Sequence, residues 1–511
     1  MAIFRILKLT IIPLLLLGGF AGEAFSSYAN ARNAFMRRDY PTAAAAYFNV
    51  YSAPRNRAER MKSEWGLAQS LQKLGLNYSA SKYYSIIVRR GRKASNPFFR
   101  KAMEELGRIN SQVSLGQAHV VQLFKAKVST SDVPGPARGF YFYYKGIEAF
   151  NQKKLERARG YFAKVPSGSS YSLGARFHLG VIANLSGGHS RAINYFERVL
   201  GATGGREHMR EIHEAALMNI ARVYYEKKRF PEAINYYGRI PRNSDYWLDA
   251  IWETSWAFFF MQKFNNSLGQ MHTIHSPFFE DRFYPETYIL QAITFLRLCR
   301  YGEVKKSMRL FKRRYAPVFK EIKSMLNRYR GNPRGFFKLV HRYRVSGRLG
   351  RYSRTTEIVK KLSGTDAYKE ARDTVRFSER ELEALSQYRG KWSSSGLRSS
   401  LKSFLRGKKS TAISDAGRRM YKLGTVYYTQ LLELSNQTKM IVAEMQLGKL
   451  AKLRSQISAY KEKSRVEFIG GMQKLNIGQS LEYWPFEKEY WEDELGFYVY
   501  NMGSRCSRKK K

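Results

Sequence analysis

The clearest pattern in this sequence is a spaced pair of small residues that recurs along its amino-terminal half. The two small residues lie twelve positions apart, and a large side chain follows four positions after the second. Copies begin 34 to 41 residues apart, except for one interval of 78 that leaves room for a degenerate copy at residues 97–137. A repeat of this length is typical of helical hairpins. The copies in register are Ala31-Ala43-Tyr47, Ala68-Ala80-Tyr84, Gly146-Ala158-Phe162, Gly180-Ala192-Phe196, Ala221-Ala233-Tyr237, Ser255-Ser267-Met271 and Ala292-Val304-Met308.

Helix packing explains these residue types. The axes of two packed helices lie about 8 to 10 Å apart, and their closest approach needs a small residue on each helix. The large side chain shares a face with the second small residue, because positions four apart are neighbours on a helix, and it fills the gap to the next hairpin. Tyr40, Leu155 and Phe230, three residues before the second small residue, are expected to mark the turns between helices. The sequence therefore predicts an all-α fold.

Two stretches, "GIEAFNQKKLERARGYFAKVP" and "IARVYYEKKRFPEAINYYGRIP", resemble the tetratricopeptide repeat (TPR). The resemblance covers about residues 28–315. It implies a right-handed superhelix of paired helices whose concave face holds peptides or partner proteins, and it implies no catalysis. We therefore expect a TPR-like solenoid over residues 28–315, followed by a basic, mostly helical carboxyl-terminal region.

The amino terminus has the features of a secretory signal. Arg5 and Lys8 precede an apolar run at residues 9–20, and small residues surround a cleavage position after Ala24. The run is shorter than the roughly 20 residues that cross a bilayer. We expect a signal peptide at residues 1–24 and a protein exported to the periplasm or cell envelope, with an uncleaved membrane anchor as the alternative. No cysteine follows the apolar run, which argues against a lipoprotein.

The chain is strongly basic, with a formal net charge of +48, and such a surface attracts anions. The charge is densest at residues 301–350, where fifteen basic residues accompany two acidic ones, and we expect a basic helical region at 316–388. Interleaved aromatics leave two interpretations: a groove for an anionic strand or acidic protein segment, or a solvated helical face with its aromatics in the core. The candidate anion-binding residues are Lys305, Lys306, Arg309, Lys312, Arg313, Arg314, Arg334, Lys338, Arg342 and Arg344.

Two further segments follow. Residues 389–412, which include "RGKWSSSGLRSS", are expected to form a flexible joint. Residues 413–480 are predicted to be one long helical segment. We expect its apolar stripe to pack against residues 366–387 rather than to form a coiled coil with a partner; the stripe comprises Leu431, Leu432, Leu434, Ile441, Met445, Leu450, Leu453 and Ile457.

The strip at residues 481–511 reverses the charge of the chain, because six acids accompany Lys488 alone between positions 481 and 495. Its Trp484-Pro485-Phe486, Glu489-Tyr490-Trp491 and Asp493-Glu494-Leu495-Gly496 segments resemble the carboxyl end of envelope TPR proteins that accompany bacterial gliding-motility machinery. That resemblance favours an envelope scaffold. Three roles remain open: an acidic clasp on the protein's own basic surface, a helix that caps the array, or a hook for another protein. The residues assigned to the strip's contacts are Trp484, Phe486, Trp491, Asp493 and Glu494.

Signals for catalysis are weak. "GGMQKLN" is similar to a segment of lytic transglycosylases, but too few residues follow Asn476 for their lysozyme-like domain. His272 and His275 share a helix face, yet two ligands do not close a metal site. No catalytic residue, metal or cofactor is predicted. Whether Cys299 and Cys506 pair stays open.

The sequence thus favours a non-enzymatic exported TPR scaffold that assembles acidic or envelope-associated protein partners and takes no small-molecule substrate. The main alternative is a module that binds anionic polymers, such as cell-wall glycan or nucleic acid, through the surface at residues 301–350. A peptidoglycan lytic enzyme is the remote alternative.

Overall fold

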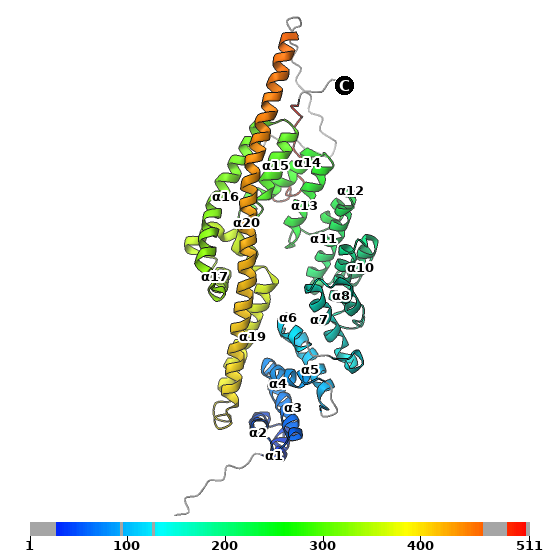
Figure 1. The fold of residues 1–511 in the computed structure, drawn as a ribbon, viewed down its shortest axis with the longest axis vertical. Coiled ribbons are helices and arrows are strands. Elements are labelled where there is room, and N and C mark those ends of the chain that lie inside the picture. The colour runs from blue at the N-terminus through cyan, green and yellow to red at the C-terminus, as the bar shows by residue number, and fades with distance from the viewer. Residues whose placement is uncertain (1–26, 92–95, 125–127, 463–487, 507–511) are drawn as a thin grey trace, which may run out of the picture. The chain divides into compact units, whose positions relative to one another are not determined.

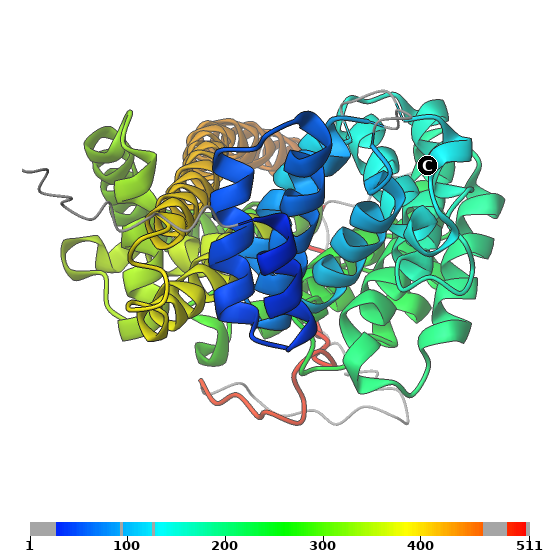
Figure 2. The same ribbon diagram turned by 90° about the horizontal axis from the view of Figure 1, so that it is seen from below.

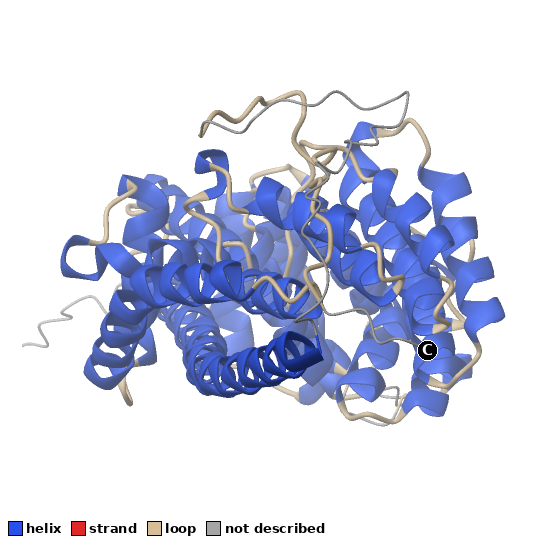
Figure 3. Cartoon of the chain, turned by 90° about the horizontal axis from the view of Figure 1, so that it is seen from above, coloured by secondary structure: helices blue, strands red, loops and turns tan. Residues whose placement is uncertain are grey.

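A computed structural model describes residues 27–91, 96–124, 128–462 and 488–506 (Figure 1). These residues form twenty α-helices joined by loops and short 3-10 turns, and none of them forms a strand (Figure 3). The predicted all-α class is therefore confirmed. The chain divides into two compact units, the first from residues 1–106 and 381–405 and the second from residues 107–380 and 406–511.

The first unit begins with two helical hairpins, coloured blue in Figure 2. Its second segment, residues 381–405, packs on them: Glu381 accepts hydrogen bonds from the backbone N–H groups of Tyr78 and Ser79, and the buried Trp392 donates its indole N–H to the carbonyl of Pro41 at 2.8 Å. Glu381 thereby satisfies free N–H groups at the start of a helix. The hairpins are α1 (Tyr28–Met36) with α2 (Tyr40–Ser52), and α3 (Arg57–Lys73) with α4 (Asn77–Arg89).

The array of hairpins continues in the second unit. The second helix of each hairpin contacts the first helix of the next, as α10 contacts α11 and α12 contacts α13, and α7 also contacts α9. The degenerate copy contains α5 (Phe99–Gln112), which begins in the first unit and ends in the second, and α6 (Gln117–Leu123), which contacts α7. The remaining pairs are α7 (Arg138–Asn151) with α8 (Leu155–Phe162), α9 (Ser172–Leu185) with α10 (His189–Thr203), α11 (Arg210–Glu226) with α12 (Phe230–Gly238), α13 (Trp247–Phe260) with α14 (Phe264–Ile274), and α15 (Glu286–Arg297) with α16 (Tyr301–Tyr329).

The predicted register of small and large residues is confirmed, because every member of the seven copies is buried. The structure also shows what the large residue covers. A Cβ atom added to Gly146 would lie 2.6 Å from the ring of Phe162, and one added to Gly180 would lie 2.7 Å from the ring of Phe196. The large side chain therefore rests on the first small residue of its own hairpin. Tyr47 also reaches the next hairpin, where its ring lies against Gly66.

Each of these seven hairpins turns through one residue with a left-handed backbone, two positions before the second helix. In the hairpin of α7 and α8 this residue is Lys153, with φ of 59°. The N–H of Lys154 donates to the carbonyl of Ala149, and the N–H of Lys153 donates to that of Phe150. This is the hydrogen-bond pattern of a Schellman motif, which satisfies carbonyl groups at a helix end. The equivalent residues are Arg38, Gly75, Gly187, Lys228, Gln262 and Cys299.

Beyond the array the chain forms α17 (Pro333–Ser346), α18 (Thr356–Ser363), α19 (Asp366–Gln387) and α20 (Leu397–Glu462). The 66-residue α20 runs beside α16 (Figure 1). The hydroxyl of Tyr421 donates to the carbonyl of Leu326 at 3.2 Å, and Phe319 stacks on Tyr428 with ring centroids 4.9 Å apart. The backbone of Gly448 lies against Tyr301. Side chains of α20 therefore pack against both ends of α16.

Two expectations for this region are corrected. The joint predicted at residues 389–412 is helical from Leu397 onward, because buried apolar residues recur there at helical spacing behind a short serine-rich turn. The apolar stripe of α20 does not pack mainly on residues 366–387. Its buried members share one core with α16 and α17, to which α19 contributes Tyr368 and Ala371. Those members are Leu431, Leu434, Ile441 and Met445, whereas Leu432, Leu450 and Leu453 are exposed.

None of the described helices combines the length and hydrophobicity that a bilayer-spanning segment needs. The predicted signal at residues 1–24 lies outside the described residues, as do the side chain of Ile457 and most of the carboxyl-terminal strip before Lys488.

Candidate interaction surfaces

Residues 488–506, here called the strap, lie along α14 in an extended and turning conformation that contains no helix. The helical cap predicted as one alternative is therefore wrong for the described part of the strip. Side chains of α14 bind the backbone of the strap: Gln270 donates to the carbonyl of Gly496 at 2.8 Å, and Thr273 accepts from its N–H at 2.8 Å. Further along, the N–H of Tyr500 donates to the backbone carbonyl of Asn265 at 3.1 Å. The contacts follow the strap over most of the length of α14.

One glycine of α14 permits this close approach. A Cβ atom on Gly269 would lie 1.6 Å from the carbonyl oxygen of Tyr498, which is far inside the contact distance of two atoms. The amide of Asn265 also binds both backbone groups of Met502, at 3.3 and 3.4 Å. The surface of α14 therefore fits an extended chain: Gly269 leaves room for the main chain, and the side-chain amides of Asn265 and Gln270 bind its backbone.

Apolar and aromatic side chains anchor the strap. Leu495 is buried in the core that also contains Leu217 and Trp247. The ring of Tyr490 stacks on His272, with centroids 4.7 Å apart, and the hydroxyl of Tyr500 lies 3.2 Å from Nδ1 of the same histidine. Burial lowers the pKa of His272 to about 4, so that this ring is neutral near pH 7. These anchors explain why the strip is rich in aromatic residues.

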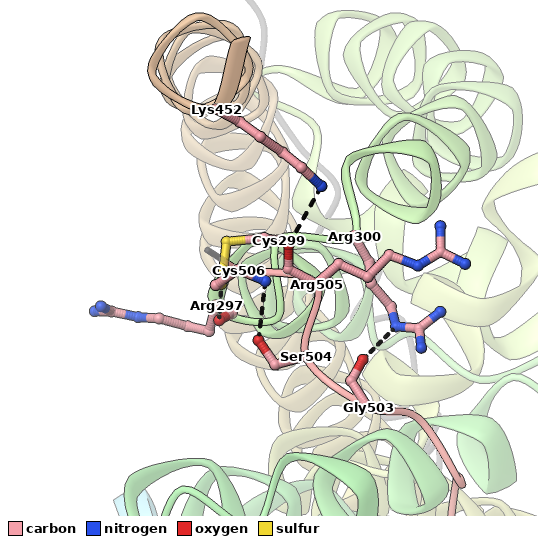
Figure 4. Close-up of a disulfide and its surroundings, with 8 residues drawn as sticks. All are labelled: Arg297, Cys299, Arg300, Lys452, Gly503, Ser504, Arg505 and Cys506. Atoms are coloured by element: carbon pink, nitrogen blue, oxygen red, sulfur yellow. Dashed lines mark hydrogen bonds between the residues drawn. A yellow bond between two sulfur atoms is a disulfide. The ribbon is translucent and has the colours of Figure 1, made fainter. Parts of the chain in front are cut away.

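A disulfide fixes the end of the strap (Figure 4). Cys299, the left-handed residue of the turn between α15 and α16, is bonded to Cys506. Around it, Arg300 donates to the carbonyl of Gly503 at 3.0 Å, the N–H of Arg505 donates to the carbonyl of Leu298 at 2.9 Å, and Lys452 of α20 donates to the carbonyl of Arg505 at 3.3 Å. The two cysteines left open by the sequence therefore pair, because the strap brings them together.

Three acidic residues of the strap, Glu492, Asp493 and Glu494, do not form the ion pairs that the clasp hypothesis predicted. Arg242 donates to the backbone carbonyls of Glu492 and Asp493 rather than to their carboxylates. No ion pair among the described residues involves Glu492, Asp493 or Glu494. Trp491 is 48% exposed, and the predicted anchors Trp484 and Phe486 lie outside the described residues. The strip does fold back on its own array, and backbone hydrogen bonds, the buried Leu495 and the contacts of Tyr490 and Tyr500 with His272 hold its described part there.

The predicted anion-binding residues lie on the outer faces of α16 and α17. Nine of the ten are exposed, and the tenth, Arg314, is half-buried: it donates to the carbonyl of Glu280 at 2.6 Å and pairs with Glu357 at 3.4 Å. Burial raises the pKa of Glu357 to about 7, although Arg314 opposes that shift. Most aromatics of this region point the other way. Phe311, Tyr315, Phe336 and Phe337 are buried in the core, and the partly buried Phe319, Tyr329 and Tyr343 pack against it. The structure therefore shows a basic helical face and no basic aromatic groove among these residues.

The two histidines of α14 have separate environments. His275 contacts the hydroxyl of Thr287 at 2.7 Å and stacks on Tyr288, whereas His272 faces the strap. Sequence reasoning noted their shared face and missed the role of His272 as a platform for Tyr490, because that contact joins residues that are far apart in sequence.

Comparisons with known proteins are remote. No family model and no curated protein sequence matches this chain. Among solved structures, the apo form of RapI aligns over 75% of this chain and 96% of its own, with 10% identity and a TM-score of 0.32. The Rap conjugation gene regulator of plasmid pLS20, solved with the Phr* peptide, aligns over 67% of this chain and 97% of its own, with 10% identity and a TM-score of 0.28. Scores this low carry no argument, and the all-α assignment rests on the helices and contacts described above.

Proposed function

We propose that this protein is an exported, non-enzymatic TPR-like scaffold that holds other proteins together in the cell envelope, in a complex of the motility type. The observation that carries the proposal is the strap. The array binds an extended segment through hydrogen bonds to the segment's backbone, with Gly269 giving room for the main chain. Surfaces of this kind recognise extended peptides, because backbone hydrogen bonds supply affinity and side-chain anchors supply specificity.

The disulfide supports the export half of the proposal. Disulfides persist in the periplasm and outside the cell and are rare in a reducing cytosol. The Cys299–Cys506 bond therefore agrees with the signal predicted at residues 1–24. Amino-terminal sequencing of the native protein should begin near Phe25 or Asn30. An intact Met1 terminus in a soluble cytoplasmic fraction would contradict export.

Peptide recognition can be tested with the strap sequence itself. In the full-length protein, reduction of the disulfide should allow the strap to leave α14, so that a labelled synthetic peptide of residues 488–506 can bind in its place. We expect saturable binding, measured by fluorescence anisotropy, in the reduced protein and little in the oxidised protein. Gly269→Leu should abolish it, because the added side chain occupies the position of the Tyr498 carbonyl.

Gly160→Leu is the matched control, since a Cβ atom at this exposed position meets nothing within 4 Å. If the reduced protein binds the peptide equally well with either substitution, or does not bind it at all, α14 is not a peptide-recognition surface and the proposal fails.

The alternative, an anionic-polymer module, is favoured by the nine exposed basic side chains on α16 and α17. Binding of this type weakens steeply as salt rises, because each phosphate contact releases counterions. A steep salt slope that flattens in Lys305→Gln/Lys306→Gln/Arg309→Gln would support it over the scaffold.

A further inference from the structure

The turns of the second unit follow one another along one side of its array. The second helix of each hairpin contacts the first helix of the next, as α8 contacts α9, α10 contacts α11, α12 contacts α13 and α14 contacts α15. The hairpins are therefore stacked in order, and the turns within them form a series. We name this surface the turn edge and define it as residues 151–154, 185–188, 226–229, 260–263 and 297–300. It lies at the helix ends, apart from the faces of α14 that hold the strap.

The turn edge is basic. Its only acidic residue is Glu226, whose carboxylate accepts a hydrogen bond from Asn184. Among the described residues, only Arg229 of its basic side chains is ion-paired, with Glu232. All of them are exposed except the half-buried Arg300, so that their charges face solvent. They are Lys153, Lys154, Lys227, Lys228, Arg229, Lys263, Arg297 and Arg300.

Large apolar side chains stand among these charges. Leu185 and Phe260 are 59% and 52% exposed, and both occupy the position four residues before the second helix of their hairpin. Phe260 stacks on Phe230, with ring centroids 5.8 Å apart, and on Trp256, at 5.7 Å. Exposed aromatic rings interleaved with lysine and arginine are typical of surfaces that enter the headgroup layer of a bilayer.

The disulfide attaches the end of the strap to the same edge. Cys299 lies in the turn edge, so the bond fixes residue 506 there. Clusters of basic residues next to apolar anchors bind anionic lipid, with each Lys or Arg near the surface contributing about 1 kcal/mol.

We propose that the turn edge of the second unit binds an anionic lipid surface. Its lysines and arginines contact phosphate headgroups, and Leu185 and Phe260 enter the boundary between headgroups and acyl chains. Anionic headgroups match the basic side chains of the turn edge, and acyl chains match its protruding apolar side chains. An acidic polypeptide would satisfy the charge alone and leave Leu185 and Phe260 in water.

The test is cosedimentation of the full-length oxidised protein with phosphatidylcholine vesicles that contain or lack phosphatidylglycerol. We expect binding that requires phosphatidylglycerol. Lys227→Gln/Lys228→Gln should weaken it about tenfold or more, because each lysine near the surface is worth roughly a factor of five. The matched control, Lys338→Gln/Arg342→Gln, removes the same charge from exposed positions of α17, which follows the far end of α16, and should change binding less than twofold.

The variant Phe260→Ser distinguishes a lipid partner from an acidic protein partner. The variant loses the stacking of this ring on Phe230 and Trp256, so its melting temperature should fall, but the folded protein should also bind vesicles about tenfold less tightly as the ring is lost. Soluble polyglutamate serves as the comparison ligand. Three outcomes would overturn the proposal. The first is that the protein binds vesicles equally well with and without phosphatidylglycerol, and the second is that the α17 control loses as much binding as the turn-edge variant. The third is that polyglutamate binds as tightly as vesicles and that Phe260→Ser does not change its binding.

Discussion

Cys299 and Cys506 are separated by 207 residues in sequence, and their Cα atoms lie 5.0 Å apart. The bond between them closes a loop that contains all of α16, α17, α18, α19 and α20. A cross-link over so long a loop removes many conformations from the unfolded chain.

The first prediction follows from this loop. Cys299→Ser/Cys506→Ser should lower the stability of the protein by about 2–5 kcal/mol, because the unfolded state regains that freedom. Urea denaturation followed by circular dichroism measures the change. Wild-type protein in dithiothreitol should match the double variant, and the variant should not respond to dithiothreitol. If the double variant and the reduced wild-type protein were as stable as the oxidised wild type, the non-covalent contacts of the strap alone would determine stability at the carboxyl-terminal end.

The second prediction concerns the crossing of α9 and α10. Gly180→Ala should destabilise the protein by about 1–3 kcal/mol, because the added methyl group would overlap the ring of Phe196. Gly160→Ala, on the exposed face of α8, should instead stabilise it by about 0.4–1 kcal/mol through the lost freedom of the unfolded chain. Thermal melts of the pair should shift in opposite directions. Shifts of the same sign would contradict the observed packing of the small residue under the large one.

The third prediction exchanges residues between two turns. Gly187 and Gln262 both have a left-handed backbone, with φ of 74° and 61°. Gly187→Gln should cost about 1–2 kcal/mol, because a side chain is strained in that conformation. Gln262→Gly should be neutral or slightly stabilising, since relief of strain is offset by the greater backbone entropy that glycine loses on folding. Chemical denaturation of the two variants measures the contrast, and a loss in Gln262→Gly as large as in Gly187→Gln would count against it.

The fourth prediction is a pH dependence at the strap. The pKa of His272 is about 4 in the folded protein, below the 6.5 of an exposed histidine. The unfolded chain therefore binds more protons between these values, so the contribution of this group is complete above pH 6.5 and is lost as the pH falls toward 4. About 3 kcal/mol should disappear over that window. His272→Gln should remove this part of the dependence of the unfolding free energy on pH. Burial lowers the pKa of His275 to about 3, but this residue is present in both proteins, so its contribution cancels in the comparison.

The comparison is the difference in unfolding free energy between wild type and His272→Gln, measured from pH 7.5 down to 4. Parallel curves for the two proteins would show that His272 does not sense the pH through its contacts with Tyr490 and Tyr500.

The hairpin register could be predicted from the sequence because its causes are local. A helix crossing excludes large side chains at both contact points, and so Ala158 and Ala233 mark those points in any copy of the repeat. The turns follow from the same spacing. Their left-handed residue was not predicted, because only Gly75 and Gly187 carry the glycine that signals it, while lysine, arginine, glutamine and cysteine occupy the other five.

The strap could not be predicted for the opposite reason. Its contacts join Gly496 to Gln270 and Tyr490 to His272, over sequence separations that no periodicity records. The acidic residues of the strip drew attention to charge, whereas Leu495 and the backbone supply the contacts. The predicted basic residues lie on exposed faces of α16 and α17, and whether they bind anions stays a prediction. Composition cannot tell that the aromatics between them pack inward, since that depends on which side of α16 meets α20.

The disulfide also determines how the protein would carry a mechanical load. Tension applied between residues 28 and 506 would pass from Cys299 directly to Cys506, so that the chain between them would bear no force and roughly 700 Å of extended length would stay hidden. That unloaded ring includes residues 381–405, which pack on the loaded helices α1–α4 in the first unit. Pulling would therefore peel these hairpins away from a partner segment that is itself not stretched, and reduction of one bond would lengthen the tether.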